Sequence, residues 1–210
     1  MSWILWFIII IVSIILIITV LDWLIIGIAR PAKKKSYDKE YMLKNRNRID
    51  YQISTECSGY SLAYVLRSFG IEADGNDIYA KIHRKMRNGA VLPRILVKVI
   101  QSYGFEAKYV KGSMETLKAD LSEGKRVIVF IKTRLEKNWL HYVPVVGYDE
   151  EGIYIAESMC SLVNCDEEYY NRKLTNPEFL RYWDTREVYM PFYRNTYLII
   201  DNVEKKFNNI

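Results

Sequence analysis

Residues 141–157 read HYVPVVGYDEEGIYIAE, and this stretch decides the fold class. Its first part, 141–148, and its last part, 153–157, are rich in β-branched and aromatic residues, which favour strands. The four residues between them, 149–152, are acidic and end in glycine, as is typical of a turn. We therefore predict an antiparallel hairpin that begins at His141 and ends at Glu157, and such a hairpin brings these two side chains close together.

The residues before the hairpin predict mainly helices. Spaced apolar residues, a serine N-cap at Ser113 and a proline at Pro93 indicate where helices start. Asn76 is the N-cap that we expect for the second helix. The predicted helices cover residues 57–69, 76–86, 93–103 and 113–124.

Further strands flank the hairpin on both sides. We predict strands over residues 127–132 and 196–200, and a short helix that starts at Thr175 or Asn176, with Pro177 in its first turn. Helices followed by antiparallel strands predict the α+β class, with N-terminal helices packed on an antiparallel sheet.

The N-terminus carries a long apolar stretch. From Trp3 to Leu21 run 19 residues with no charged side chain, enough for a helix of roughly 29 Å that spans one bilayer core. No basic residue precedes this stretch, and it is too long for the apolar part of a signal peptide. Residues 1–29 are therefore predicted to be an uncleaved, single transmembrane anchor, which makes the lipid bilayer a partner and the cell membrane the location.

Residues 30–50 are basic and polar, and we predict that they form a juxtamembrane linker. Residues 51–210 are then left for one folded domain. The positive charges nearest the apolar helix are Arg30 and residues 33–35, all on its C-terminal side. Because positive flanks stay inside, we predict that the domain faces the cytoplasm.

Charge and cysteine content exclude several classes of function. The chain carries a formal net charge of +5, but residues 36–210 carry only +2, so nothing predicts nucleic acid as a partner. Three cysteines without a C-x-x-C pair are too few for a disulfide framework or a zinc site. We therefore expect no metal and no cofactor. Cys160 and Cys165 are expected to be free thiols in a loop.

Cys57 is the candidate nucleophile. It stands where the first helix of the domain is predicted to start, and the unpaired N–H groups and dipole there favour a thiolate. The neighbouring Glu56 works against this effect. His141 is then the candidate base, because the only other histidine, His83, lies in a basic stretch typical of a solvated surface.

Two further residues complete a candidate site. Glu157 is predicted to orient the imidazole of His141. Gln52 precedes Cys57 by five residues, and its amide is predicted to form an oxyanion hole with the backbone N–H of Cys57. Taken singly, a packing cysteine, a structural histidine and a solvated glutamine are the simpler interpretations of these residues.

Taken together, Gln52, Cys57, the stretch 141–148 and the acidic residue after the hairpin resemble the papain-like bacteriocin-processing (double-glycine leader) peptidase family, over about residues 51–200. The resemblance implies a papain-like fold and a Cys-His-Asp triad with a glutamine oxyanion donor. These roles would fall on Cys57, His141, Glu157 and Gln52.

The chain departs from the family pattern in three places. Glu157-Ser158 stands where Asp-Pro is usual, so the third triad member is longer by one methylene. Ser58-Gly59 stands where Gly-Pro or Gly-Ala is common after the cysteine. The glutamine lies five residues before the cysteine, whereas related transporter domains often show six.

The leading hypothesis is a membrane-anchored cysteine peptidase that cuts a peptide or protein through a thioester intermediate. The chain contains no P-loop, so a peptide exporter that it serves would be a separate protein. Two alternatives stay open at this point. One is a catalytically degenerate module that only binds a peptide, and the other is a thiol deamidase or acyltransferase on the same fold.

Overall fold

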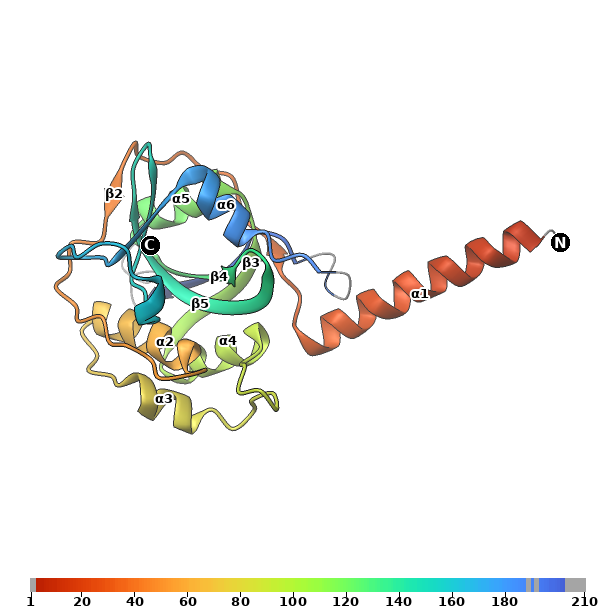
Figure 1. Cartoon of the computed structure of the whole chain (residues 1–210), viewed down its shortest axis with the longest axis horizontal. Helices are drawn as coiled ribbons and strands as arrows, with labels where there is room; N and C mark the ends of the chain where they lie inside the picture. Colours follow the sequence, from red (N-terminus) through yellow and green to blue (C-terminus); the bar gives the residue numbers. More distant parts are fainter. Residues whose placement is uncertain (1–2, 188–189, 191–192, 203–210) are drawn as a thin grey trace, which may run out of the picture.

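A computed structural model describes residues 3–187, 190 and 193–202 of the chain. Within these residues, helices cover both faces of a single sheet, and one long helix projects away from it (Figure 1). The fold is α+β, as the sequence predicts. The helices are α1 (Trp3–Ile25), α2 (Cys57–Ser68), α3 (Gly75–Lys81), α4 (Pro93–Ser102), α5 (Met114–Ser122) and α6 (Asn176–Trp183), with a 3₁₀ turn η1 (Cys160–Leu162).

The sheet has the strand order β1-β3-β8-β4-β5-β6-β7, and β2 pairs with β5 off this path. All of the pairs are antiparallel except β1 with β3. The strands are β1 (Arg30–Pro31), β2 (Tyr41–Met42), β3 (Phe105–Lys111), β4 (Arg126–Arg134), β5 (Lys137–Tyr148), β6 (Gly152–Ile155), β7 (Arg172–Thr175) and β8 (Thr196–Asn202).

The predicted hairpin is present as β5 and β6, with different ends. β5 starts at Lys137 because it also pairs with β4, so His141 lies inside the strand and not at its start. β6 ends at Ile155, which leaves Glu157 just beyond the pairing. Asp149 closes the turn, since one carboxylate oxygen accepts the N–H groups of Glu151 and Gly152.

Most predicted helices form, but the predicted bounds of one of them need correction. Ser113 caps α5 in a capping box, and Thr175 does the same for α6. The second predicted helix, 76–86, is wrong in its bounds. Asp74 rather than Asn76 is its N-cap, because the Asp74 carboxylate accepts two backbone N–H groups, and the helix ends at Lys81.

Residues 30–50, predicted to be a linker, lie against the domain and contribute two short strands. Arg30 pairs with Val110 in β3, and Tyr41 pairs with Tyr148 in β5. Side-chain amides of this segment also bond to α2, as in the 2.7 Å contact of Asn47 with the Tyr64 carbonyl. Such pairing depends on partners far away in the sequence, so the polar composition of the segment does not reveal it.

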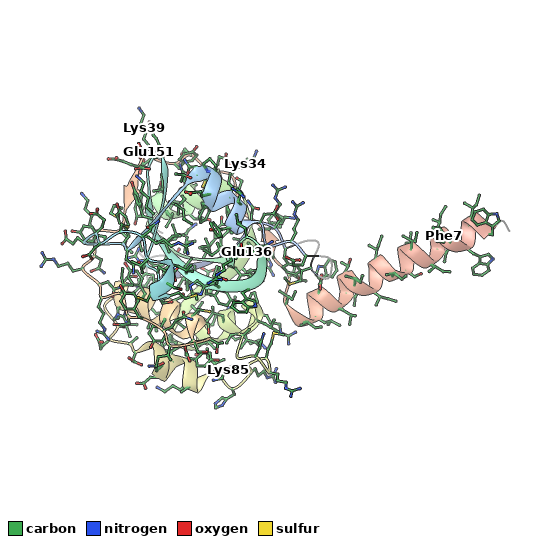
Figure 2. All side chains as sticks on the ribbon, in the orientation of Figure 1. Phe7, Lys34, Lys39, Lys85, Glu136 and Glu151 are labelled. Carbon is green, nitrogen blue, oxygen red and sulfur yellow. The ribbon has the colours of Figure 1, made fainter. Side chains whose placement is uncertain are left out.

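The helix α1 exposes nearly all of its apolar side chains (Figure 2), and it is long and apolar enough to cross a membrane. The chain just after it is attached to the domain. Ile26 is buried in the core, and its carbonyl accepts the backbone N–H of Arg94. The Tyr193 hydroxyl donates to the Gly27 carbonyl at 2.8 Å. The end of α1 is therefore held by the folded domain.

Two main hydrophobic clusters lie on the two sides of the sheet. Residues of α2 and α4 pack in one cluster, and residues of α5 and α6 pack in the other. β4 contributes to both clusters because alternate side chains of a strand point to opposite faces, with Val127 in one and Ile128 in the other. The helix α2 is thereby fixed against the sheet.

This packing predicts the effect of shortening Leu66, which is 0% exposed in α2. Leu66→Ala leaves a cavity beneath this helix and is expected to lower the free energy of unfolding by about 2–5 kcal/mol. Urea unfolding of the full chain in detergent micelles, followed by tryptophan fluorescence, measures this loss. Leu180→Ala, at a position 40% exposed in α6, is the control. Equal effects of the two variants would contradict the assignment of the core.

Candidate active site

Cys57 is the first residue of α2, and its thiol is free and half-buried. The preceding residue, Glu56, makes no side-chain cap on this helix. Its carboxylate instead turns back and accepts the backbone N–H of Ser54 at 2.7 Å. The acidic neighbour is therefore engaged by the loop that precedes the helix.

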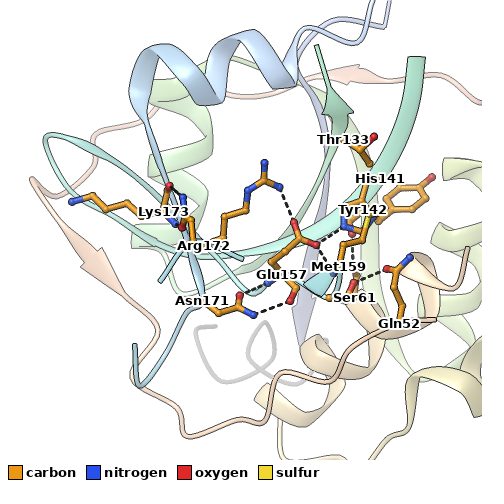
Figure 3. Close-up of polar contacts among 12 residues, drawn as sticks. Gln52, Ser61, Thr133, His141, Tyr142, Glu157, Met159, Asn171, Arg172 and Lys173 are labelled. Carbon is orange, nitrogen blue, oxygen red and sulfur yellow. Dashed lines mark hydrogen bonds and ion pairs between the residues drawn. The ribbon is translucent and has the colours of Figure 1, made fainter. Parts of the chain in front are cut away.

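The first turns of α2 are held in place by two contacts. The Ser61 hydroxyl donates to the Tyr142 carbonyl in β5 at 2.8 Å, which joins the helix of Cys57 to the strand of His141 (Figure 3). Gly59 lies where α3 crosses α2, and a side chain there would collide with the Gly75 carbonyl. The glycine that follows the Cys57-Ser58 pair thus permits close helix packing.

His141 lies between Cys57 and Glu157. Its side chain is only 2% exposed, and its Nε2 is 2.7 Å from Oε1 of Glu157 (Figure 3). The Cys57 sulfur lies near enough to the imidazole to raise the pKa of His141. Because Nε2 is engaged by the carboxylate, Nδ1 is the ring atom left for the sulfur. The structure therefore brings together the three residues that the hairpin and the helix start predict.

Glu157 is fully buried and has a partner for each carboxylate oxygen. Oε1 accepts the backbone N–H of Met159 at 2.8 Å in addition to its contact with His141. Oε2 lies 2.8 Å from Nη1 of Arg172. Asn171 holds the backbone on both sides, since it accepts the Glu157 N–H at 2.7 Å and donates to its carbonyl at 2.9 Å.

These contacts set the charges in the site. Burial by itself would lower the pKa of His141, but the Glu157 carboxylate and the Cys57 sulfur outweigh it and raise this pKa to about 10. Burial would raise the pKa of Glu157, whereas the charges of His141 and Arg172 bring it below its usual value. The raised pKa of His141 and the lowered pKa of Glu157 agree, because both favour an imidazolium paired with a carboxylate.

Gln52 is tied to the residue that follows Glu157. Its backbone N–H donates to the Ser158 carbonyl at 2.9 Å, and its Oε1 accepts the Ser158 hydroxyl at 2.7 Å. The amide nitrogen donates to the Ser54 carbonyl at 2.6 Å. A primary amide carries two N–H bonds, so one of them is left for a further acceptor.

Sequence reasoning missed Arg172, Asn171 and the N–H of Met159. Arg172 is in β7, a strand that we did not predict, and it reaches Glu157 because Ile155 of β6 is its partner in the sheet. No local pattern distinguishes this arginine from a surface one. Only the pairing of β7 with β6 buries it.

The other candidates lie elsewhere. His83 is exposed and follows the end of α3, rather than lying on a helix. Cys160 is exposed and Cys165 is half-buried, and both are free thiols. Within the described part of the chain, no group of three His, Cys, Asp or Glu side chains is placed to hold a metal ion.

The fold is that of the papain-like cysteine peptidases. Residues 39–188 match the model of the Peptidase_C39 like family, which is most of the chain. The chain therefore belongs to this family. The search of curated protein sequences found no match to this chain.

Solved structures show the same fold. One, described as a C39-like peptidase from Bacillus anthracis, is 19% identical, with a TM-score of 0.60 over 79% of this chain and 98% of the other. A double glycine motif protease from an AMS/PCAT transporter, in complex with its leader peptide, is 19% identical, with a TM-score of 0.53 over 79% and 100%. The peptidase domain of Streptococcus ComA, a bifunctional ABC transporter, is 14% identical, with a TM-score of 0.53 over 75% and 99%.

The buried pair predicts how His141 responds to the loss of its carboxylate. In Glu157→Gln the anion is gone while burial persists, so the pKa of His141 is expected to fall steeply from about 10. Because the chain has two histidines, NMR titration of labelled histidine in a His83→Gln background follows His141 alone. Glu56→Gln is the control, since that carboxylate faces Ser54. An unchanged titration of His141 in Glu157→Gln would exclude the pair.

Proposed function

We propose that this chain is a membrane-anchored cysteine peptidase that cleaves a peptide or protein with Cys57 as nucleophile, His141 as base, Glu157 as orienter and Gln52 in the oxyanion hole. The observation that carries the proposal is the connected series from the Cys57 thiol through His141 to the buried Glu157 carboxylate. Membership of a peptidase family supports the same reaction class.

The resting site is expected to hold a thiolate beside an imidazolium. A cationic imidazole next to a cysteine at a helix N-terminus stabilises the anionic sulfur, which is the reactive form. The raised pKa of His141 supports this charge state at neutral pH. Glu157 keeps the ring oriented, with Nε2 on its own side and Nδ1 toward the sulfur.

The first half of the reaction forms a thioester. The Cys57 thiolate attacks the carbonyl carbon of the scissile amide, and the carbonyl electrons move to its oxygen. Collapse of this tetrahedral intermediate breaks the C–N bond, and the His141 imidazolium gives its proton to the leaving amine. The products of this half are a free amine and an acyl group on Cys57.

The second half restores the enzyme. Neutral His141 takes a proton from water, the resulting hydroxide attacks the thioester carbonyl, and the thiolate of Cys57 leaves. The acid product departs and His141 is again an imidazolium. In both halves the negative oxygen would bind the Cys57 backbone N–H and the second amide hydrogen of Gln52, whose orientation the contacts with Ser54 and Ser158 support.

The bilayer anchor is the second part of the proposal. The apolar length of α1 supports a single membrane span, and the attachment of residues 26–30 to the domain supports a position directly at the membrane surface. The positive charges of Arg30 and residues 33–35 support a cytoplasmic domain. A substrate would then be cut close to the inner face of the membrane, and an exporter of the product would be a separate protein.

Labelling of the cysteines tests the nucleophile. Cys57 is expected to react with iodoacetamide near neutral pH much faster than Cys160 and Cys165, because His141 stabilises only its thiolate. Removal of the imidazole in His141→Ala is expected to slow this labelling. Peptide mass mapping of the full chain in detergent micelles, across pH, measures the three rates.

Hydrolysis is followed in parallel with a peptide library and mass detection of the products. Cys57→Ser is expected to abolish cleavage, and Cys160→Ser serves as the matched control. Products in which an amide has become an acid without chain cleavage would identify a deamidase instead. If Cys57 reacts no faster than the other two cysteines, or ignores the His141 change, the chain is a peptide-binding module and the peptidase proposal fails.

Protease accessibility tests the membrane orientation. In intact cells that produce the full chain, residues 36–210 are expected to resist an added protease, and to be digested only after the membrane is permeabilised. Immunoblotting with an antibody against the domain gives the result. Loss of the domain from intact cells would place it outside, and would overturn the orientation while leaving the reaction untouched.

A further inference from the structure

Arg172 is a buried charge that lies directly behind the candidate site. Arg172 is 3% exposed, and its Nη1 is 2.8 Å from Oε2 of Glu157. In Figure 3 its guanidinium approaches the carboxylate from the side opposite His141. Neither the family resemblance nor the chemistry of the nucleophile assigns a role to this residue.

The position of Arg172 is determined by two elements outside the hairpin. Its backbone in β7 is paired with Ile155 of β6, two residues before Glu157. Its guanidinium lies over the ring of Tyr182 in α6, 5.5 Å from the ring centre. Cation–π contact and sheet pairing therefore hold the arginine before any substrate arrives.

Burial makes this arginine informative. A guanidinium loses its hydration in the interior, and a buried ion pair is often no more stable than apolar side chains of the same volume. An arginine in this place is therefore poorly explained by stability alone. The carboxylate with which it forms a close ion pair belongs to Glu157, the residue that contacts His141.

We propose that Arg172 is a positioning residue, which holds Glu157 with one carboxylate oxygen toward His141 and keeps that carboxylate anionic. This inference rests on the proposed function, because it gives Arg172 a role only through Glu157 and His141. It adds β7 and α6 to the elements that determine the reactivity of Cys57.

The additional methylene of Glu157 explains why such a residue is needed. A glutamate side chain has one more rotatable bond than an aspartate, so contact with His141 alone leaves its carboxylate free to rotate. Arg172 fixes Oε2, and the backbone N–H of Met159 fixes Oε1. With both oxygens held, the longer carboxylate is restricted to one orientation.

The charge of Arg172 also acts on the protons of the site. A positive charge behind Glu157 favours the carboxylate over the carboxylic acid, and through this carboxylate it favours the imidazolium of His141. Removal of this charge is expected to move the protonation of Glu157 to higher pH, so that the His141 imidazolium beside Cys57 loses its anionic partner over a wider acidic range. The titratable groups that face this set are His141 and Tyr142 from β5, Cys57 from α2, and Glu178 and Tyr182 from α6.

The experiment measures the rate of Cys57 alkylation from acidic to alkaline pH in the full chain in detergent micelles. In Arg172→Met the acidic limb of this profile is expected to move up by about one pH unit, which is about a 10-fold lower rate at a fixed pH on that limb. Arg172→Lys keeps the charge and is expected to lie near wild type. Lys173→Met is the matched control, because Lys173 is the next residue in β7 and makes exposed ion pairs.

A second comparison separates positioning from a purely structural role. Glu157→Gln is made with and without Arg172→Met. If Arg172 acts through Glu157, the second change is expected to add no further shift to the profile. The double variant removes the charges of both Glu157 and Arg172. It therefore remains informative even where thermal unfolding shows that Arg172→Met alone does not fold.

The outcomes are distinguishable. An Arg172→Met profile equal to that of wild type, or a further shift in the Glu157→Gln background, overturns the role of Arg172 and leaves the proposed peptidase intact. If the pH profile of Cys57 alkylation in His141→Ala equals that of wild type, the proposed function itself fails. Three results together support the inference. Arg172→Met shifts the profile of the otherwise wild-type chain, Arg172→Lys leaves it near wild type, and Arg172→Met adds no shift in the Glu157→Gln background.

Discussion

The ion pair between His141 and Glu157 is the contact on which the rest of the site depends. Both side chains are removed from water, and an isolated buried charge would neutralise itself rather than remain charged. The pair persists because every oxygen of the carboxylate has a donor. Around it, the structure brings Cys57 from a helix, Met159 from a turn and Arg172 from a separate strand. The charges that surround Cys57 therefore come from residues that lie far apart in the sequence.

The N-terminal segment connects the long apolar helix α1 to the same site. After α1 the chain enters the sheet at Arg30, pairs again at Tyr41 and reaches Gln52, whose backbone bonds to Ser158 beside Glu157. Each of these contacts is made by the backbone, so the path depends little on side-chain identity. The folded domain is therefore attached to the end of α1 within the described residues.

Local patterns predicted much of this arrangement. The hairpin of 141–157 followed from alternating β-branched and aromatic residues around an acidic turn, and the start of α2 followed from its apolar face. The second helix was placed wrongly because both Asp74 and Asn76 are good caps, and only the actual contacts of Asp74 decide between them. The strands β1, β2 and β7 have too few residues for a periodic signal, since pairing with distant strands creates them.

The sequence by itself determined the α+β class, the long apolar helix and the four residues Gln52, Cys57, His141 and Glu157 as candidates, because periodicity and residue chemistry are local properties. Only the tertiary structure decided that Glu157 is held from both sides, and that the charges of His141 and Arg172 lower its pKa despite burial. One of its partners is Arg172, which has no local feature to mark it and becomes a buried partner when β7 pairs with β6. Burial and the distances between charges are properties of the folded chain, and they determine the protonation states on which the chemistry depends.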